Sequence, residues 1–194
     1  MTYFLDFDRT LFDNDSFQKY LVTLPEWKPF KERMETTTIG VPRDRTLQGG
    51  VEREQLWQEI EAWFAAGSFS FQGQELQRFV FPDALTFLEK NGKKSVIVSS
   101  GGTDLTFQKA KVTHSGLLNS VSRTIFMPRH VSKGSQIAQV KHEYPPPYFF
   151  VDDLTSQLDS AAETCPDVLL YEMRRDGREG SGHYPIIQTL LELP

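Results

Sequence analysis

The chain has 194 residues and a formal net charge of −5, and its 39% hydrophobic content is enough to bury a core. This length suits one domain, or a core domain with a modest insertion. The acidic charge argues against DNA or RNA as a partner, because nucleic-acid binding depends on neutralising phosphates. Cys165 is the only cysteine, which excludes a disulfide framework and a multi-cysteine metal site.

The N-terminal segment MTYFLDFDRT has no basic region and carries an acid by position 6, unlike a signal peptide. No apolar run approaches the roughly 20 residues that cross a bilayer. We therefore expect a cytoplasmic protein that does not bind membranes.

The first predicted element is a short buried strand, Tyr3-Phe4-Leu5, that ends in a polar loop. Residues 15–80 contain no clear strand pattern. We expect one helix capped by Ser16, a broken polar stretch, and a second helix over residues 51–66. The breakers of the polar stretch are Gly40, Pro42, Gly49 and Gly50. Residues 15–80 are therefore predicted to be a small helical cap inserted after the first strand.

From Pro82 onward, predicted helices and strands alternate. The predicted helices cover residues 83–90, 105–111, 133–144, 156–164 and 186–193, and the predicted strands 96–98, 121–126, 149–151 and 168–171. This order predicts an α/β fold, with a doubly wound parallel sheet covered by helices on both faces. The predicted catalytic core comprises residues 1–14 and 81–194.

Two pairs of aspartates follow predicted strands: Asp6 and Asp8 after the first, and Asp152 and Asp153 after a later one. The carboxyl ends of parallel strands share one edge of a sheet, so the pairs should converge there. Such close carboxylates need a cation between them or a shared proton, and Mg²⁺ suits a few hard oxygen ligands. Taken alone, the first pair would be explained by a solvated turn and the second by a helix cap.

A hydroxyl and a lysine complete the polar set. Ser99 follows the apolar run VIV and could hold an anionic oxygen, while Gly101 and Gly102 allow close backbone approach. Ser100 is the alternative to Ser99. Lys133, at a predicted helix start, could supply positive charge to a phosphate. Alternatively, the serine is a helix cap and the lysine a solvated surface group.

In this order, the motifs resemble those of the haloacid dehalogenase superfamily. The motifs are YFLDFDRTLFD, VIVSSGG, SKGS around Lys133, and FFVDDL. The resemblance covers residues 1–13 and roughly 82–160 and leaves out the insertion. It implies the α/β core and a variable cap.

The resemblance also implies roles for the motif residues. Asp6 would be the nucleophile that forms an aspartyl-phosphate, and Asp8 would be first the general acid and then the general base. Thr10 would steady the loop beside the phosphate. The transferring phosphoryl group would be held chiefly by Ser99, in preference to Ser100, and by Lys133, with Gly101 alongside. Ser99 is preferred because it directly follows the apolar run and has the usual family spacing from Asn91.

The same resemblance implies a magnesium ion held by Asp6, Asp153 and the backbone carbonyl of Asp8, with Asp152 as a ligand or a supporting residue. The expected activity is Mg²⁺-dependent hydrolysis of a small phosphorylated metabolite. A phosphomutase, a dehalogenase and a non-catalytic phosphate-binding module are the alternatives. Asp8 favours phosphate chemistry over dehalogenation, because a halide leaves without a proton donor. The substrate and the oligomeric state cannot be derived from the sequence.

Overall fold

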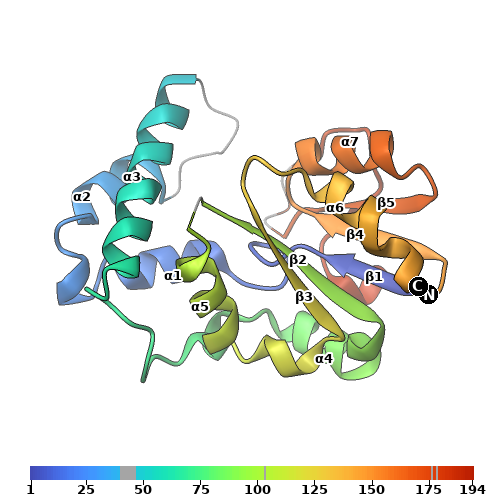
Figure 1. The fold of residues 1–194 in the computed structure, drawn as a ribbon, viewed down its shortest axis with the longest axis horizontal. Helices are drawn as coiled ribbons and strands as arrows, with labels where there is room; N and C mark the ends of the chain where they lie inside the picture. The colour runs from blue at the N-terminus through green and yellow to red at the C-terminus, as the bar shows by residue number, and fades with distance from the viewer. Residues whose placement is uncertain (40–46, 103, 176, 178) are drawn as a thin grey trace.

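The protein is described by a computed structural model that covers residues 1–39, 47–102, 104–175, 177 and 179–194. Its centre is a six-stranded parallel sheet with the strand order β3-β2-β1-β4-β5-β6 (Figure 1). The strands are β1 (Thr2–Leu5), β2 (Ser95–Gly101), β3 (Arg123–Pro128), β4 (Tyr148–Asp152), β5 (Val168–Met173) and β6 (Ile186–Ile187). The predicted doubly wound α/β fold is confirmed.

Alternation along the strands directs side chains to two separate apolar layers. Phe4 of β1 packs in the cluster that includes residues of α6 (Lys133–Val140) and α7 (Thr155–Thr164). Its neighbours Tyr3 and Leu5 belong to the other cluster, with residues of α4 (Pro82–Asn91) and α5 (Thr106–His114). Figure 1 shows these two helix pairs on opposite faces of the sheet. Because both faces are covered, β1 is buried along its whole length.

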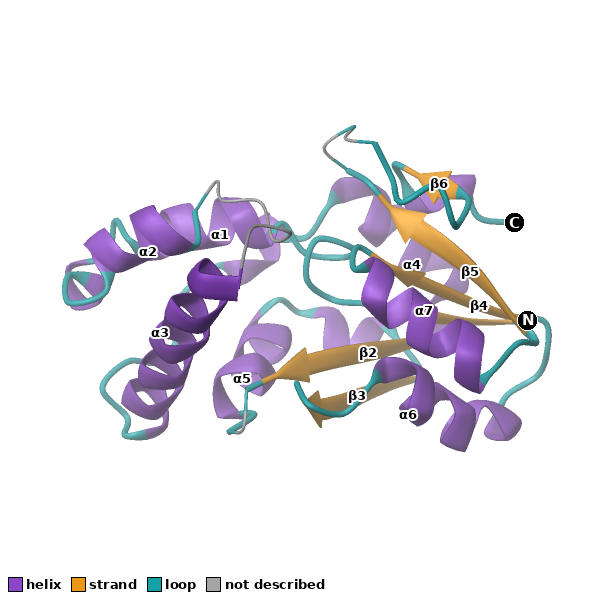
Figure 2. Cartoon of the chain, turned by 90° about the horizontal axis from the view of Figure 1, so that it is seen from above, coloured by secondary structure: helices purple, strands orange, loops and turns teal. Residues whose placement is uncertain are grey.

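A helical segment follows the first strand, as predicted. It contains α1 (Asn14–Leu21), α2 (Lys31–Thr37) and α3 (Leu47–Ala65), which extend from one side of the core in Figure 2. The chain leaves and re-enters the core at one place, where Asp13 N donates to Phe79 O at 2.7 Å. The segment has its own aromatic centre, in which the buried Trp27 lies edge-on to Trp63 with ring centroids 5.4 Å apart.

The first and third helices differ in detail from the sequence prediction. Helix α1 begins at Asn14 and not after Ser16, because the Asp13 carboxylate accepts the Ser16 N–H and caps the helix. Gly49 and Gly50 lie inside α3 and do not interrupt the helix, contrary to the prediction. The other two predicted breakers, Gly40 and Pro42, lie outside the described residues.

Helix α3 is 19 residues long and is amphipathic. Leu56 and Ile60 are fully buried, whereas Glu59 is exposed. No helix among the described residues is both long and apolar enough to cross a membrane.

The predicted C-terminal helix over residues 186–193 is wrong. Ile186 and Ile187 form the edge strand β6, which pairs in parallel with Glu172 and Met173 of β5. A 3₁₀ turn over Leu190–Glu192 follows. The apolar spacing of this segment suggested a helix, but the β-branched pair after Pro185 finds a partner strand, which local periodicity does not reveal.

Candidate active site

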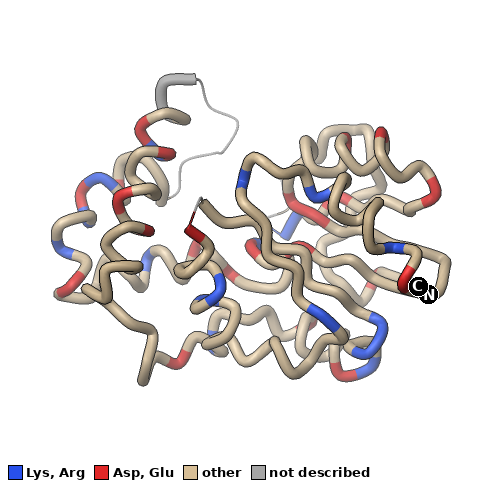
Figure 3. The backbone as a smooth tube through the Cα atoms, viewed as in Figure 1, with Lys and Arg blue, Asp and Glu red and all other residues tan. Residues whose placement is uncertain are grey.

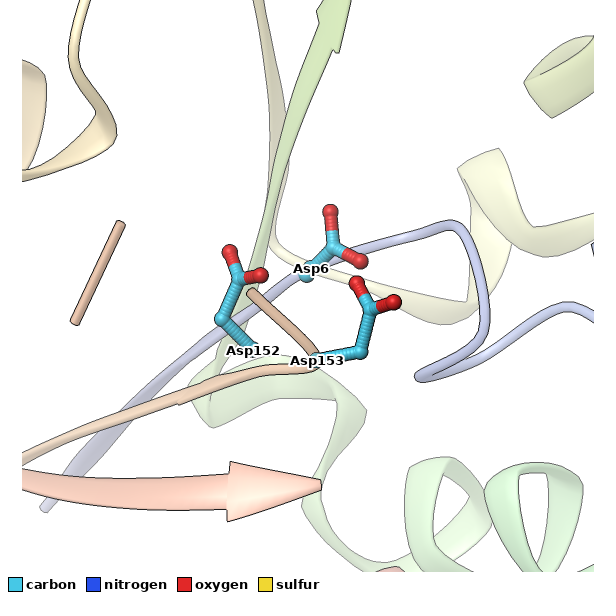
Figure 4. Close-up of side chains that lie close together, drawn as sticks. All are labelled: Asp6, Asp152 and Asp153. Atoms are coloured by element: carbon cyan, nitrogen blue, oxygen red, sulfur yellow. The ribbon is translucent and has the colours of Figure 1, made fainter. Parts of the chain in front are cut away.

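Three aspartates meet at the carboxyl edge of the sheet. β1 and β4 are neighbours, with Leu5 in register with Val151, so Asp6 and Asp152 follow side by side. The Asp6 N–H continues the ladder by donating to Val151 O at 2.9 Å. Asp6, Asp152 and Asp153 each place one carboxylate oxygen within 4.8 Å of the others (Figure 4). Three of the four strand-end aspartates thus converge as predicted, whereas Asp8 lies outside this cluster and turns toward α5.

Lys133 lies among these carboxylates, although the sequence left open that it was a surface residue. It begins α6 and is almost fully buried. Its Nζ donates to Asp6 Oδ1, and to Asp152 Oδ2 at 2.6 Å. Burial by itself would lower the pKa of Lys133, but the carboxylates of Asp152 and Asp6 raise it above its ordinary value. The ammonium group is therefore charged and directed at Asp6.

The carboxylate cluster carries more negative charge than Lys133 neutralises. Burial raises the pKa of Asp6 well above its ordinary value; Lys133 opposes this shift, and Asp152, Asp153 and Asp8 increase it. A divalent cation would supply the missing positive charge, and buried carboxylate oxygens are the ligands that Mg²⁺ prefers. The donor set therefore fits a magnesium ion.

The two neighbouring aspartates after β4 differ in their surroundings. Asp152 is fully buried, and its Oδ1 accepts the Leu154 N–H at 2.8 Å while its Oδ2 accepts from Lys133. The side chain of Asp153 is 10% exposed and lines the cavity described below. Asp152 thus fixes the lysine, whereas Asp153 lines the cavity and forms a 3.7 Å ion pair with Arg9.

Asp8 is held by a second lysine that the sequence did not indicate. The loop after β1 turns at Arg9, whose φ of 62° is left-handed, and directs Asp8 toward α5. Lys111 Nζ lies 2.6 Å from Asp8 Oδ1, and Gln108 Nε2 donates to Asp8 Oδ2 at 3.2 Å. Gln108 and Lys111 are three residues apart, on one face of α5. This spacing is common in helices, so it would not by itself have pointed to Asp8.

The two candidate serines occupy different places. β2 continues to Gly101, beyond the predicted end at Val98. Ser100 and Gly101 line the cavity. Ser99 is 1% exposed and is absent from the cavity wall, and its hydroxyl accepts from Gln108 Nε2 at 2.7 Å. The geometry therefore favours Ser100 over Ser99 as the residue that contacts a ligand.

Thr10 is fully buried and does not line the cavity, so the structure does not place it among ligand-contacting residues. Its carbonyl accepts two hydrogen bonds from Arg175, at 3.0 Å from Nε and 2.6 Å from Nη2. Arg175 also forms a bidentate pair with Asp83 of α4, at 2.8 and 3.0 Å. Arg175 thereby links the loop after β1 to the C-terminal part of the sheet, a role that no sequence pattern indicated.

A cavity of about 350 Å³ connects these groups with the helical segment. Asp6, Asp8, Ser100, Lys133 and Asp153 lie in its wall. The opposite wall comes from α3, where Trp57 and Glu61 are four residues apart on one helix face. Charges of both signs are spread over the helical segment and the core in Figure 3. The cavity has the size of a small-molecule site.

Helix α3 carries two tryptophans: Trp63 packs in the interior of the helical segment, and Trp57 faces the cavity. Trp63 stacks on Phe69 with centroids 5.7 Å apart. Trp57 lines the cavity and lies 5.8 Å from Phe107 of α5.

No protein-family model and no curated protein matches the sequence. Solved structures do match over nearly the whole chain. A haloacid dehalogenase-like hydrolase from Burkholderia xenovorans has a TM-score of 0.60 and 22% identity, covering 97% of this chain and 92% of its own. YfnB, a HAD hydrolase from Bacillus subtilis described as bound to magnesium, has a TM-score of 0.56 and 13% identity, covering 99% and 96%.

A β-phosphoglucomutase-like protein from Thermotoga maritima also matches, with a TM-score of 0.55 and 12% identity, covering 97% of this chain and 94% of its own. The chain has the fold of the haloacid dehalogenase superfamily hydrolases.

Proposed function

We propose that the protein is a Mg²⁺-dependent phosphatase that hydrolyses a small phosphate monoester through an aspartyl-phosphate on Asp6. The observation that carries the proposal is the contact of the buried Lys133 ammonium with Asp6, beside Asp153 and at the wall of the cavity. A cation beside a carboxylate offsets its repulsion from an anionic phosphate and so makes attack on phosphorus feasible.

In the first step, a carboxylate oxygen of Asp6 attacks phosphorus, and the bond between phosphorus and the ester oxygen breaks. Asp8 donates a proton to the departing oxygen, which leaves as an alcohol. In the second step, water attacks the phosphoryl group while Asp8 accepts its proton. The products are inorganic phosphate and the regenerated Asp6 carboxylate.

The remaining residues bind and orient. Lys133 and the Ser100 hydroxyl would hold the phosphoryl oxygens, and Asp152 keeps Lys133 in place. Asp6 and Asp153 would hold Mg²⁺, with the Asp8 carbonyl as a further ligand. When bound, the ion would neutralise phosphate charge.

The proposed substrate is a small phosphorylated metabolite, because the cavity is of small-molecule size and is closed on one side by α3. Asp8 lies with Asp6 in the cavity wall, where its carboxyl group could exchange a proton with a leaving oxygen, a step that dehalogenation does not need. A phosphomutase would keep both aspartates and differ only in the fate of the phosphoryl group.

The test is a screen of phosphorylated metabolites and a generic aryl phosphate, with inorganic phosphate and isomer formation measured together. We expect Mg²⁺-dependent phosphate release by the wild-type protein and none by Asp6→Asn. Isomer formation without phosphate release would identify a mutase instead. No turnover of any ester would leave a non-catalytic phosphate-binding module as the better account.

A further inference from the structure

A buried carboxylate of the helical segment contacts the loop that follows Ser100. Glu61 of α3 is 8% exposed, and its Oε1 accepts the Gly102 N–H at 2.9 Å. The two residues are 41 positions apart, so the bond joins the helical segment to the core. It forms next to the cavity wall that holds Asp8, Ser100 and Gly101.

A side chain at Gly102 would displace the Glu61 carboxylate. A Cβ placed there would lie 1.6 Å from Glu61 Oε2 and 2.3 Å from Oε1, so the carboxylate occupies the space of a side chain. The preceding Gly101 is also confined, because its Cβ would lie 3.0 Å from the Cβ of Gln108. The end of β2 is therefore contacted by Glu61 at Gly102 and by Gln108 at Gly101.

Gln108 links this loop to the remaining catalytic groups. Its Nε2 donates both to Ser99 Oγ and to Asp8 Oδ2. Any shift of the loop at Gly101 would press on Gln108 and disturb the hydrogen bond to Asp8. The position of Gly102 is thus coupled by contact to Asp8 and to Ser100.

A simple link between the two parts of the molecule does not need a buried acid. Arg129 and Glu54 already form an exposed ion pair between the β3–α6 loop and α3. Burying a carboxylate costs free energy unless hydrogen bonds compensate it. Burial raises the pKa of Glu61, and Arg129 opposes that shift. The free-energy cost of burying Glu61 is therefore better explained by a function in the neighbouring cavity than by a simple link between the two parts.

We propose that Glu61 is a positioning residue for the phosphate site: by accepting the Gly102 N–H it fixes the end of β2, where Ser100 faces the cavity. The phosphate site is then complete only when α3 lies over the core. This inference rests on the proposed phosphatase function. Glu61 itself would not contact the phosphate, because two anions repel.

Inhibition by orthovanadate tests the proposal, since this small phosphate mimic reports on the phosphoryl site without a leaving group. Removal of a hydrogen bond to a charged acceptor should raise the inhibition constant by about ten-fold in Glu61→Ala. Gly102→Ala should have a similar effect by displacing the carboxylate. Glu61→Gln retains an acceptor oxygen and should stay within about three-fold of wild type. Glu59→Ala, an exposed position on the same helix that pairs with Arg33 of α2 and lies outside the cavity wall, is the matched control and should leave vanadate inhibition unchanged.

Hydrogen exchange of the Gly102 amide gives a second readout that does not depend on activity. It should be faster in Glu61→Ala than in wild type and Glu59→Ala. Unchanged exchange, or an unchanged vanadate constant in Glu61→Ala, would overturn the proposal. A raised KM for substrate with unchanged vanadate inhibition would assign Glu61 to leaving-group binding instead. Failure of the phosphatase proposal would be seen separately, as wild-type protein without phosphate release.

Discussion

Lys111 Nζ lies 2.6 Å from Asp8 Oδ1 and 3.3 Å from Asn14 Oδ1. Asp6 and Asp8 therefore each have their own buried lysine, Lys133 for Asp6 and Lys111 for Asp8. The arrangement separates two carboxylates that would otherwise repel each other. It also fixes the direction in which Asp8 presents its oxygens to the cavity.

Lys111→Met should lower kcat for a phosphate ester with a poor leaving group by about 10- to 100-fold, because Asp8 loses the group that orients it for proton transfer. Steady-state kinetics measure this loss. An activated aryl phosphate should be affected less, since it departs with little help from an acid. Lys109→Met, on the exposed side of the same helix, is the control. Equal kinetic constants for the two variants would show that Lys111 has no part in the reaction.

The two serines of β2 should respond differently to substitution by alanine. Ser100→Ala should lower kcat/KM by about ten-fold or more, because a hydrogen-bond donor to the phosphoryl group is lost. Ser99→Ala should mainly reduce the free energy of unfolding, by about 1 kcal/mol, because the Gln108 amide loses its 2.7 Å acceptor. Kinetics and urea denaturation of both variants provide the comparison. The opposite pattern would restore Ser99 as the phosphate contact.

Removal of divalent metal with a chelator should abolish turnover, and added Mg²⁺ should restore it. Asp153→Asn should raise the Mg²⁺ concentration for half-maximal activity by at least about ten-fold, because a charged ligand becomes neutral. Asp167→Asn, an exposed aspartate paired with Lys141, should leave the Mg²⁺ titration unchanged. Full activity in excess chelator would show that the aspartate cluster has no metal-dependent role.

The close contact between α6 and α7 at Gly134 should make the stability of the fold sensitive to a larger residue there. A Cβ on Gly134 would lie 2.5 Å from the backbone of Ser160 and Ala161. Gly134→Ala should therefore destabilise the fold by about 1–3 kcal/mol. Gly50→Ala is the control, since no atom lies within 4 Å of its Cβ and alanine favours the helix. Urea denaturation should show the two changes with opposite sign, and equal stability of both variants would contradict the packing described here.

The strand-end aspartates were predictable because parallel strands bring their carboxyl ends to one edge, whatever the details of packing. The choice between Ser99 and Ser100 was not, because a shift of one residue along a strand reverses the direction of the side chain. The true end of β2 depends on its pairing with β3, from Val96 with Arg123 to Gly101 with Pro128.

Residues on helices were the least accessible to sequence analysis. Lys111, Gln108 and Glu61 reach the site only because α5 and α3 pack in one particular rotation against the core. Their types and spacing are ordinary for amphipathic helices. The prediction of a C-terminal helix was wrong for a related reason, since Ile186 becomes a strand residue only through its pairing with Glu172.

The most direct test of the account is to locate the phosphoryl group on the protein. Asp8→Asn, incubated with Mg²⁺ and an activated aryl phosphate, should accumulate a phosphorylated form, because the first step needs little acid and the second lacks its base. Mass spectrometry with peptide mapping should place the group on Asp6, and the double variant with Asp6→Asn should carry none. A label on a histidine or serine, or full activity of Asp6→Asn, would contradict the covalent aspartate mechanism.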